Sequence, residues 1–420
     1  MVKHIFRFLA AAIALSLPLS PLGARAESSL PSLKAAAVKQ PVLESRAPAS
    51  SGPGVESLNL PPVMFADEGV VGNSIAKVLD AAQSTLDIAI YSFDYRSLRN
   101  AITEAAERGV RVRLIINAGT AYEEGKKPSA DIEAMEKAGV QIRTLRGVAN
   151  YYRGIQHNKF MIADGKIMQS GSFNWTKSAD TSSSENVLFI SDPATIKAFS
   201  GYFRFMWAQA HAIGKDVSEY APPPADEELV SPLADASIEF NGEAFPAASF
   251  SPLGKTGETL ARAVNSASKS IDVAVFSLNL YTLVDGLIAA RKRGAKVRIV
   301  SDYMQAVGKS QIDGTLKLLE AGIDMRINDG PSEAANEGNM HHKFAVFDGA
   351  LVETGSYNWT HGAETRNFDS LVFSAAPEVV EAFQGEFEKL FAASTKLKAS
   401  LIREKIKERE EKAAAKAEAK

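Results

Sequence analysis

The apolar and polar residues of this chain alternate between a helical period and a strand-like period. Amphipathic stretches with apolar positions three or four residues apart are each followed by a short β-branched run. A glycine stands at several of these changes, where a helix ends and a strand begins. This alternation predicts an α/β fold with a mixed β-sheet flanked by helices. The elements predicted in the first part of the chain are a helix at Ser74–Gln83, a strand at Leu86–Ser92, a helix at Leu98–Arg108, a strand at Val110–Ile116, a helix ending near Ala138 and a strand at Val140–Thr144.

The whole pattern occurs twice. "TLDIAIYSF" around Asp87 matches "SIDVAVFSL" around Asp272, and "AAERGVRVRLIIN" matches "AARKRGAKVRIVSD". The offset between matching residues stays between 183 and 185. A single long offset indicates a duplicated domain rather than an array of short repeats.

The strongest match is a stretch of twenty residues, "HNKFMIADGKIMQSGSFNWT" from His157 and "HHKFAVFDGALVETGSYNWT" from His341. The His and Lys of each copy are two residues apart in a strand-like run, so they share one face of a sheet. The Ser and Asn of each copy share a face for the same reason. The Asp-Gly pair between the two runs is a hairpin signal, so we interpret Asp164 and Asp348 as turn residues rather than catalytic acids.

These residue types suit the chemistry of a phosphoryl group. Lys supplies positive charge, and Asn and Ser supply oriented hydrogen-bond donors, whereas Lys is not a typical metal ligand. If the two copies face each other, a phosphate between them has a histidine on either side. One imidazole can then attack phosphorus while the other protonates the leaving oxygen. An acid eleven residues after each Asn, Glu185 or Asp369, can hold the imidazole Nδ1–H.

These residues resemble the phospholipase D superfamily, whose motif H-x-K-x4-D-x6-G-S-x-N is met in both copies. The resemblance implies two phospholipase D-like domains packed about a pseudo-two-fold axis with one active site between them. It implies a phosphodiesterase with a phosphohistidine intermediate and neither a metal nor another cofactor. His157 is then the nucleophile.

Two residues depart from the typical motif or lie outside it. Asp369 is one methylene shorter than the acid typical of the family, and His342 stands at a variable position that we interpret as structural. The catalytic residues carried over by position are His157, His341, Lys159, Lys343, Asn174, Asn358, Glu185 and Asp369, with Ser172 and Ser356 at the substrate and Gly171 and Gly355 in structural roles.

The substrate class is open from the sequence. Tyr151, Tyr152 and Arg153, just before the first motif, can bind a nucleic-acid backbone or anchor at a lipid interface. The matching stretch of the second half, "INDGPSEAANEGNM", is acidic, and a long polyanion needs basic residues on both sides. We therefore favour hydrolysis of phospholipid head groups at a membrane surface, with a nuclease acting on DNA or RNA as the alternative. A phosphatidyl transferase and a non-catalytic binding protein are less favoured, and no obligate protein partner and no transmembrane segment are expected.

The N-terminus has the pattern of a secretory signal. Lys3 and Arg7 precede an apolar run at Phe8–Leu19, and Ala24-Arg25-Ala26 resembles a cleavage site. Cleavage there removes three basic residues and no acid, which changes the net charge from −3 to −6. The chain has no cysteine, in keeping with an oxidising compartment. The sequence thus predicts an exported protein, periplasmic or secreted.

Breaks in composition divide the chain into six parts. Ser, Pro and Ala dominate one segment after the signal, and "YAPPPADEELVSPLADAS" separates the two copies of the repeat. The predicted parts are a signal peptide at 1–26, a flexible linker at 27–60, the first phospholipase D-like domain at 61–212, an acidic Pro-rich linker at 213–238, the second domain at 239–394 and a charged helical tail at 395–420.

Overall fold

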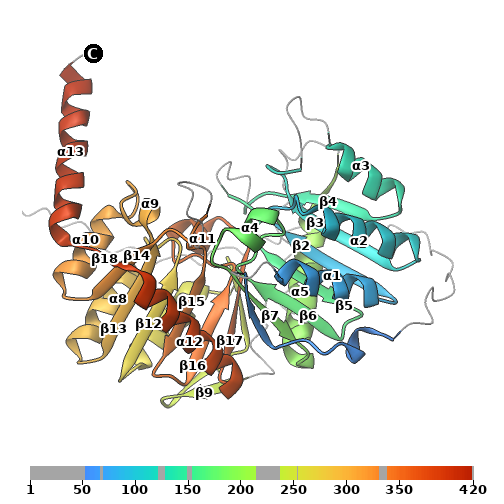
Figure 1. Cartoon of the computed structure of the whole chain (residues 1–420), viewed down its shortest axis with the longest axis horizontal. Coiled ribbons are helices and arrows are strands. Elements are labelled where there is room, and N and C mark those ends of the chain that lie inside the picture. Colours follow the sequence, from blue (N-terminus) through green and yellow to red (C-terminus); the bar gives the residue numbers. More distant parts are fainter. Residues whose placement is uncertain are drawn as a thin grey trace, which may run out of the picture. The chain divides into compact units, whose positions relative to one another are not determined.

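Two mixed sheets of eight strands each form the framework of the protein (Figure 1). The computed structural model describes residues 53–66, 70–121, 128–148, 154–213, 237–252, 254–330 and 338–418. The predicted signal peptide, most of both predicted linkers and the three residues Tyr151, Tyr152 and Arg153 lie outside these ranges. The predicted domain boundaries therefore stay predictions.

The first sheet has the strand order β1-β7-β6-β5-β2-β3-β4-β8. Its central strands β2, β3 and β4 are parallel, and the other neighbours pair in antiparallel fashion. The strands are β1 (Val63–Phe65), β2 (Thr85–Ile90), β3 (Arg111–Asn117), β4 (Gln141–Leu145), β5 (Lys159–Ala163), β6 (Ile167–Gly171), β7 (Asn186–Ile190) and β8 (His211–Ala212). The helices are the 3-10 turn η1 (Val55–Ser57) and α1 (Val71–Ala81), α2 (Arg96–Glu107), α3 (Ala130–Lys137), α4 (Lys177–Thr181) and α5 (Pro193–Gln209).

The second sheet repeats this topology strand for strand, in the order β11-β17-β16-β15-β12-β13-β14-β18. Its strands are β11 (Ala248–Ser251), β12 (Ser270–Val275), β13 (Lys296–Asp302), β14 (Asp324–Asn328), β15 (Lys343–Phe347), β16 (Leu351–Gly355), β17 (Asp369–Ser374) and β18 (Thr395–Lys396), preceded by the separate pair β9 (Ser237–Phe240) and β10 (Glu243–Pro246). The helices are α7 (Thr256–Ser266), α8 (Tyr281–Lys292), α9 (Tyr303–Ala306), α10 (Ile312–Glu320), α11 (His361–Thr365), α12 (Pro377–Ala393) and α13 (Ala399–Glu418).

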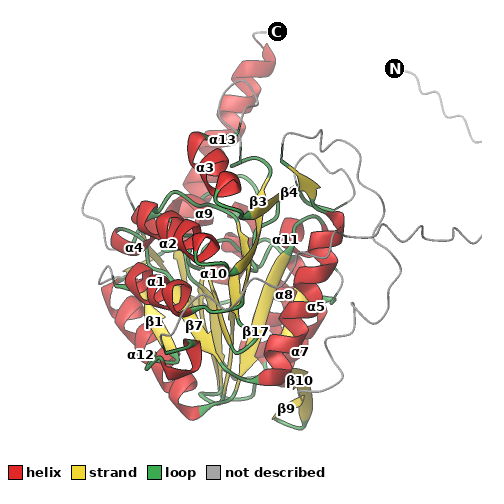
Figure 2. Ribbon diagram, turned by 90° about the vertical axis from the view of Figure 1, so that its right-hand side faces the viewer, coloured by secondary structure: helices red, strands yellow, loops and turns green. Residues whose placement is uncertain are grey.

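Helices cover both faces of the sheets, as Figure 2 shows. The ends of the central strands nearest the sheet junction are therefore mostly buried, and Val, Ile, Leu and Ala supply most of their buried side chains. Gly109 and Gly139 end helices with φ of 90° and 102°, the left-handed region that glycine adopts without steric cost. The predicted fold class, two duplicated α/β domains with mixed sheets, is confirmed.

An ion pair joins the first two parallel strands of each half, and it is buried in the second half and partly buried in the first. In the second half, Arg298 Nε lies 2.7 Å from Asp272 Oδ1. The Arg298 guanidinium also lies 4.8 Å from the ring centroid of Phe387 on α12. Arg113 makes the same contacts in the first half, to Asp87 at 2.7 Å and to the ring of Phe203 on α5 at 4.9 Å. The strand pair thus positions the long helix on its outer face in both halves.

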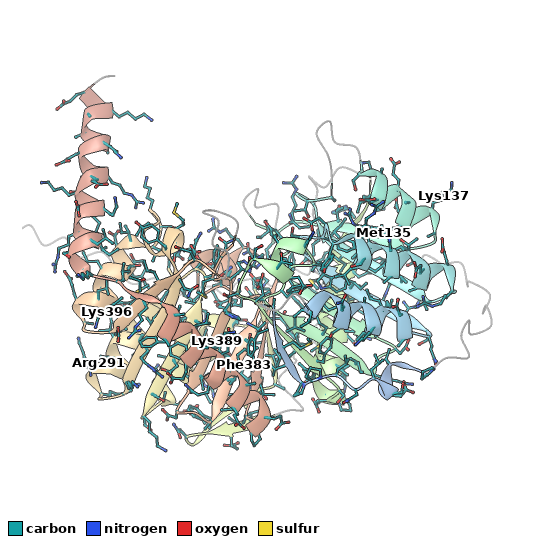
Figure 3. The ribbon with its side chains drawn as sticks, viewed as in Figure 1. Met135, Lys137, Arg291, Phe383, Lys389 and Lys396 are labelled. Carbon is teal, nitrogen blue, oxygen red and sulfur yellow. The ribbon has the colours of Figure 1, made fainter. Side chains whose placement is uncertain are left out.

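The two halves are packed into one compact unit, residues 46–420. Helix α5 of the first half reaches the second sheet, because the ring of Phe250 on β11 stacks on Tyr202 at 4.2 Å and meets Phe199 at 4.9 Å. Helix α12 packs in the same way against the first half, with Phe383 at 5.5 Å from Phe65 on β1. Figure 3 labels Phe383 on α12 together with Lys389, whose side chain is exposed. These reciprocal contacts fix one half against the other.

Among the described residues, no helix has the length and apolar character needed to span a membrane.

We expect Phe250→Ala to destabilise the packing between the halves. Removing a buried phenyl ring costs about 3–5 kcal/mol of unfolding free energy, because the cavity that remains collapses only in part. Urea unfolding followed by circular dichroism measures this loss. Met304→Ala is the control, since Met304 is 65% exposed and its loss should change stability by less than about 0.5 kcal/mol. A loss below about 1 kcal/mol for Phe250→Ala contradicts the assigned packing.

Candidate active site

The two motif histidines lie just before strands β5 and β15. Both strands run antiparallel to the central strands β2 and β12, so they begin at the sheet edge where β2 and β12 end. The residue after each central strand is aromatic. The ring of Tyr91, after β2, lies 4.9 Å from the His157 ring, and that of Phe276, after β12, lies 4.7 Å from the His341 ring.

Backbone hydrogen bonds between the halves bring the two motifs together. The His157 N–H donates to the Phe368 carbonyl oxygen at 2.9 Å, and the His341 N–H donates to the Ser184 carbonyl oxygen at 3.0 Å. Phe368 and Ser184 directly precede the two trailing acids. The bridge therefore brings the acid of one half to the histidine of the other half.

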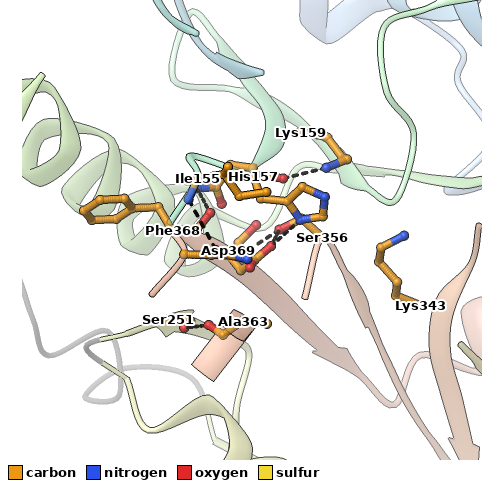
Figure 4. Close-up of polar contacts among 12 residues, drawn as sticks. Ile155, His157, Lys159, Ser251, Lys343, Ser356, Ala363, Phe368 and Asp369 are labelled. Carbon is orange, nitrogen blue, oxygen red and sulfur yellow. Dashed lines mark hydrogen bonds and ion pairs between the residues drawn. The ribbon is translucent and has the colours of Figure 1, made fainter. Parts of the chain in front are cut away.

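The histidine–carboxylate contacts are crossed. His157 Nδ1 lies 2.8 Å from Asp369 Oδ1, and His341 Nδ1 lies 2.8 Å from Glu185 Oε1 (Figure 4 shows the first pair). The sequence predicted that these acids hold the imidazole Nδ1, without indicating which acid holds which ring. Asp369 reaches His157 despite its shorter side chain. Each imidazole is thus oriented by a carboxylate that its own half does not supply.

Burial keeps both imidazoles neutral near pH 7. Burial and the positive charge of Lys159 together lower the pKa of His157 to about 4, although Asp369 opposes both effects. Burial likewise lowers the pKa of His341 to about 4 against the opposing effect of Glu185. With Nδ1–H donated to a carboxylate, each ring leaves the Nε2 lone pair for a substrate. A neutral, oriented imidazole is what a nucleophile requires.

Glu185 remains ionised even though it is buried. Burial raises its pKa, but the contacts with His341, Lys343 and Ser172 outweigh this effect, so the pKa lies below its usual value. The carboxylate can therefore stabilise an imidazolium that forms on His341.

The two motif lysines are fully buried at the centre of the site. Each ammonium donates to the backbone oxygen of its own histidine, Lys159 to His157 and Lys343 to His341, both at 2.6 Å. Burial lowers the pKa of Lys159, and the positive charge of Lys343 lowers it further. Burial lowers the pKa of Lys343 to about 8. Figure 4 shows both lysines on the same side of the His157 ring, where they can bind an anion together.

The motif asparagines have unused polar atoms. Asn174 Oδ1 and Asn358 Oδ1 are buried and have no hydrogen-bond partner among the described residues. Because the oxygen and nitrogen of an amide can exchange places, either group can face a ligand. The arrangement repeats in both halves, which favours a ligand between them over an isolated packing defect.

The motif serines contact the acids rather than an open site. Ser356 Oγ donates to Asp369 Oδ1 at 2.8 Å and accepts from the Ser370 N–H at 3.0 Å. Ser172 contacts Glu185 and accepts from the Asn186 N–H at 3.0 Å. Both serines are fully buried. These contacts fix the carboxylates that hold the histidines, and substrate binding by the two serines stays a prediction.

The motif aspartates and glycines contact only the protein framework. Asp164 has φ of 54° in the β5–β6 turn, and its carboxylate accepts from the Ser84 and Thr85 N–H groups at 2.8 and 2.9 Å. Asp348 does the same at the start of β12. At Gly171, a Cβ would clash with the Asn186 carbonyl oxygen. These residues therefore bind the hairpins to the central strands.

His342 is buried away from the central site. Its Nδ1 lies 3.0 Å from Asn186 Nδ2, and its Nε2 lies 3.4 Å from Glu386 Oε1 on α12. Its ring meets Phe65 and Phe344 edge to face. This polar contact also links the two halves.

Sequence reasoning missed Tyr91 and Phe276. The signal was present, because both copies of the repeat place an aromatic residue directly after the β-branched run, in "AIYSF" and "AVFSL". The predicted substrate contacts of Tyr151, Tyr152 and Arg153 fall outside the described residues and stay predictions. Among the residues that the structure places, no group of three His, Cys, Asp or Glu side chains is positioned to hold a metal ion.

Two sheets of identical topology with paired His-x-Lys strands at their junction define a protein of the phospholipase D-like class. The family described as "Cardiolipin synthase, PLD-like domain" matches residues 75–207 and 260–391, more than half of the chain, so the chain belongs to this family.

Curated relatives match one part of the chain. A mitochondrial cardiolipin hydrolase of Chlamydomonas reinhardtii is 34% identical over 137 residues, which cover 32% of this chain and 57% of that protein. The mitochondrial cardiolipin hydrolase of Danio rerio is 39% identical over 131 residues, or 31% of this chain and 54% of that protein. The chain thus spans little more than half the length of these relatives.

A solved structure shares the arrangement of both halves. The phosphatidylserine synthase of Haemophilus influenzae Rd KW20 superposes with a TM-score of 0.60 at 10% identity and covers 86% of this chain and 95% of its own. At this identity the likeness shows the fold alone.

The predicted periplasmic or secreted location is wrong. The named relatives are mitochondrial proteins, which contradicts export. The physical reason is that the N-terminal pattern is not specific. Residues 1–26 carry basic residues and no acid, a charge pattern that secretory signals share with organelle transit peptides. Residues 1–26 also lie outside the described part of the chain.

The crossed contacts predict crossed effects of mutation. Asp369→Asn should change the Nδ1 environment of His157 and leave His341 nearly unchanged, and Glu185→Gln should do the reverse. Long-range proton–nitrogen NMR of the imidazoles measures both, with the signals assigned from His157→Gln and His341→Gln. If each acid changes the histidine of its own half, the crossed arrangement is contradicted.

Proposed function

We propose that this protein is a phospholipase D-type phosphodiesterase that hydrolyses phospholipid head groups through a phosphohistidine intermediate. The observation that carries the proposal is the pair of imidazoles, each fixed at Nδ1 by a carboxylate of the opposite half, beside two buried lysines. Neutral imidazoles with a free Nε2 supply a nucleophile, and the two ammonium groups supply the charge that a phosphodiester requires.

In the proposed reaction His157 Nε2 attacks phosphorus and forms a P–N bond. The bond from phosphorus to the leaving oxygen breaks, and His341 gives its proton to that oxygen. Since His341 is neutral in the free protein near pH 7, it gains this proton as the anionic substrate binds beside it. Water then attacks phosphorus, His341 takes the proton from that water, and the P–N bond breaks. Asp369 and Glu185 hold the two rings in place throughout.

Phospholipid is supported as the substrate by the names of the relatives, which are cardiolipin hydrolases. The three large apolar side chains exposed in the described part of the chain, Val70, Tyr281 and Met304, are consistent with contact to lipid. Val70 and Tyr281 adjoin the first turns of α1 and α8, and Met304 follows the end of β13. By the topology of the sheets, these positions lie at the end of the central strands where the histidines lie.

We expect the purified protein to hydrolyse phospholipid in the presence of EDTA. The assay compares vesicles of cardiolipin, vesicles of phosphatidylcholine, single-stranded DNA and double-stranded DNA, and measures released head group or cleaved strand. Hydrolysis of DNA but of neither lipid replaces our substrate class with the nuclease alternative. Activity that EDTA abolishes and a divalent ion restores contradicts the phosphohistidine mechanism.

The roles of the two histidines are separable. His341→Ala keeps the proposed nucleophile and lacks the general acid and base, so turnover should fall by roughly 10²- to 10⁴-fold. An activated nitrophenyl phosphodiester needs little protonation of its leaving group, so it should still phosphorylate His157. Intact mass spectrometry after an alkaline quench should show a phosphoryl adduct on the peptide that contains His157. The matched His157→Ala protein should show none. An adduct on His341 in His157→Ala, and none in His341→Ala, reverses the assignment.

A further inference from the structure

One aromatic ring in each half contacts both the histidine and the lysine of the motif. The Lys159 ammonium lies 5.0 Å from the centroid of the Tyr91 ring, and the same ring meets the His157 imidazole at 4.9 Å with an interplanar angle of 66°. Tyr91 directly follows β2, the strand that pairs with β5. The ring is therefore held by the same strand pair as the residues it contacts.

The second half repeats this contact with a different residue. The Lys343 ammonium lies 5.3 Å from the centroid of the Phe276 ring, which meets the His341 imidazole at 4.7 Å and 62°. A phenol in one half and a phenyl ring in the other keep the same geometry. The shared feature is the aromatic ring and not the hydroxyl group of Tyr91.

The buried ammonium groups require a partner that does not compete with the substrate. Within the described residues, no carboxylate lies within ion-pair distance, 4.0 Å, of the Lys159 or Lys343 ammonium. In the part of the chain that the structure describes, each ammonium donates to the backbone oxygen of its own histidine. A carboxylate in contact would take up the remaining N–H donors and repel a phosphate. An aromatic ring attracts the cation through its negative face and leaves those donors free.

We propose that Tyr91 and Phe276 are positioning residues that hold each lysine as a cation and each imidazole in its orientation, so that both act on the phosphate. The inference rests on the proposed function for its kinetic test. Tyr91 and Phe276 themselves need not touch the phosphate. Their role is to stabilise positive charge in a site that excludes water.

Charged groups near the two lysines also influence their pKa values. Lys343 faces Glu185 on the β7 side, Asp369 on β17 and Asp302 at the end of β13, all of which oppose the lowering of its pKa by burial. Lys159 faces Lys343, Asp369 and Glu185. Since these groups remain in place in the variants, loss of the ring should lower the lysine pKa further. The lysine then loses its charge at a lower pH.

The test compares the pH profiles of kcat/KM for Phe276→Leu and Tyr91→Leu with those of Phe276→Tyr and Tyr91→Phe. Activity of the unmodified protein should fall above about pH 8, where Lys343 loses its proton. In Phe276→Leu this fall should move about one pH unit lower, which is about a fivefold loss at pH 8, a loss that approaches tenfold at higher pH, and a loss of only about a tenth at pH 6. The two variants that keep a ring should retain the original profile.

A second readout does not depend on activity. NMR of protein labelled at lysine Cε, with the signal assigned from Lys343→Arg, reports the protonation of Lys343 directly and should show the same shift in Phe276→Leu. Phe93→Leu is the control, because Phe93 follows the same strand but its ring contacts Trp175 at 5.9 Å. That variant should leave the pH profile and the lysine signals unchanged.

The possible results separate the two proposals. If the unmodified protein hydrolyses no phosphodiester, the proposed function fails, and the lysine titration still decides the role of the rings. If the protein is active and folded but both Leu variants keep the original profile and titration, the inference is overturned. It is also overturned if Phe93→Leu shifts them equally, since the effect is then a general loosening of the site.

Discussion

The crossed contact between each histidine and the carboxylate of the opposite half is the constraint on which the site depends. The two residues of each pair are separated by 212 and 156 positions in the chain, yet each pair meets at 2.8 Å. A buried carboxylate without its partner is strongly destabilising, because water no longer solvates the charge. A serine of the same half contacts each acid, but the imidazole that pairs with it comes from the opposite half. The proposed chemistry therefore needs groups from both sheets.

The rest of the framework holds this junction in register. The Asp164 and Asp348 carboxylates bind the far ends of the β5 and β15 hairpins to the central strands. At the other end, backbone hydrogen bonds to Phe368 and Ser184 join each hairpin to the opposite half. The hairpins are thus fixed at both ends, so the histidine and lysine on each one have little freedom to move. This is the preorganisation that electrostatic catalysis requires.

The parts of this structure that local patterns determine could be predicted from the sequence. The helix–glycine–strand alternation and the Asp-Gly turns are encoded within a few residues, and the duplication is visible as a repeat at one offset. The two-residue spacing of His157 and Lys159 predicts side chains on one face of a strand, although the structure begins β5 only at Lys159. The crossing of Glu185 and Asp369 could not be predicted, because it depends on how two distant segments pair. The serine contacts depend on that same pairing. The N-terminal segment misled the prediction of location for a different reason, since its charge pattern is common to more than one targeting signal.

A phosphodiester has two different ends, and a site made of two identical subunits would offer the same groups to both of them. Here the duplicated halves belong to one chain, and they have diverged at the site itself. At equivalent positions of the repeat, the first half has Tyr91 where the second has Phe276, and Glu185 where the second has Asp369. In the same way, Asn117 at the end of β3 is replaced by Asp302 at the end of β13. Because both halves are encoded in one chain, a substitution can change one half and leave the other unchanged. The two sides of the pseudo-symmetric junction are therefore chemically different. If a phosphodiester binds across it as proposed, its two orientations would not be equivalent.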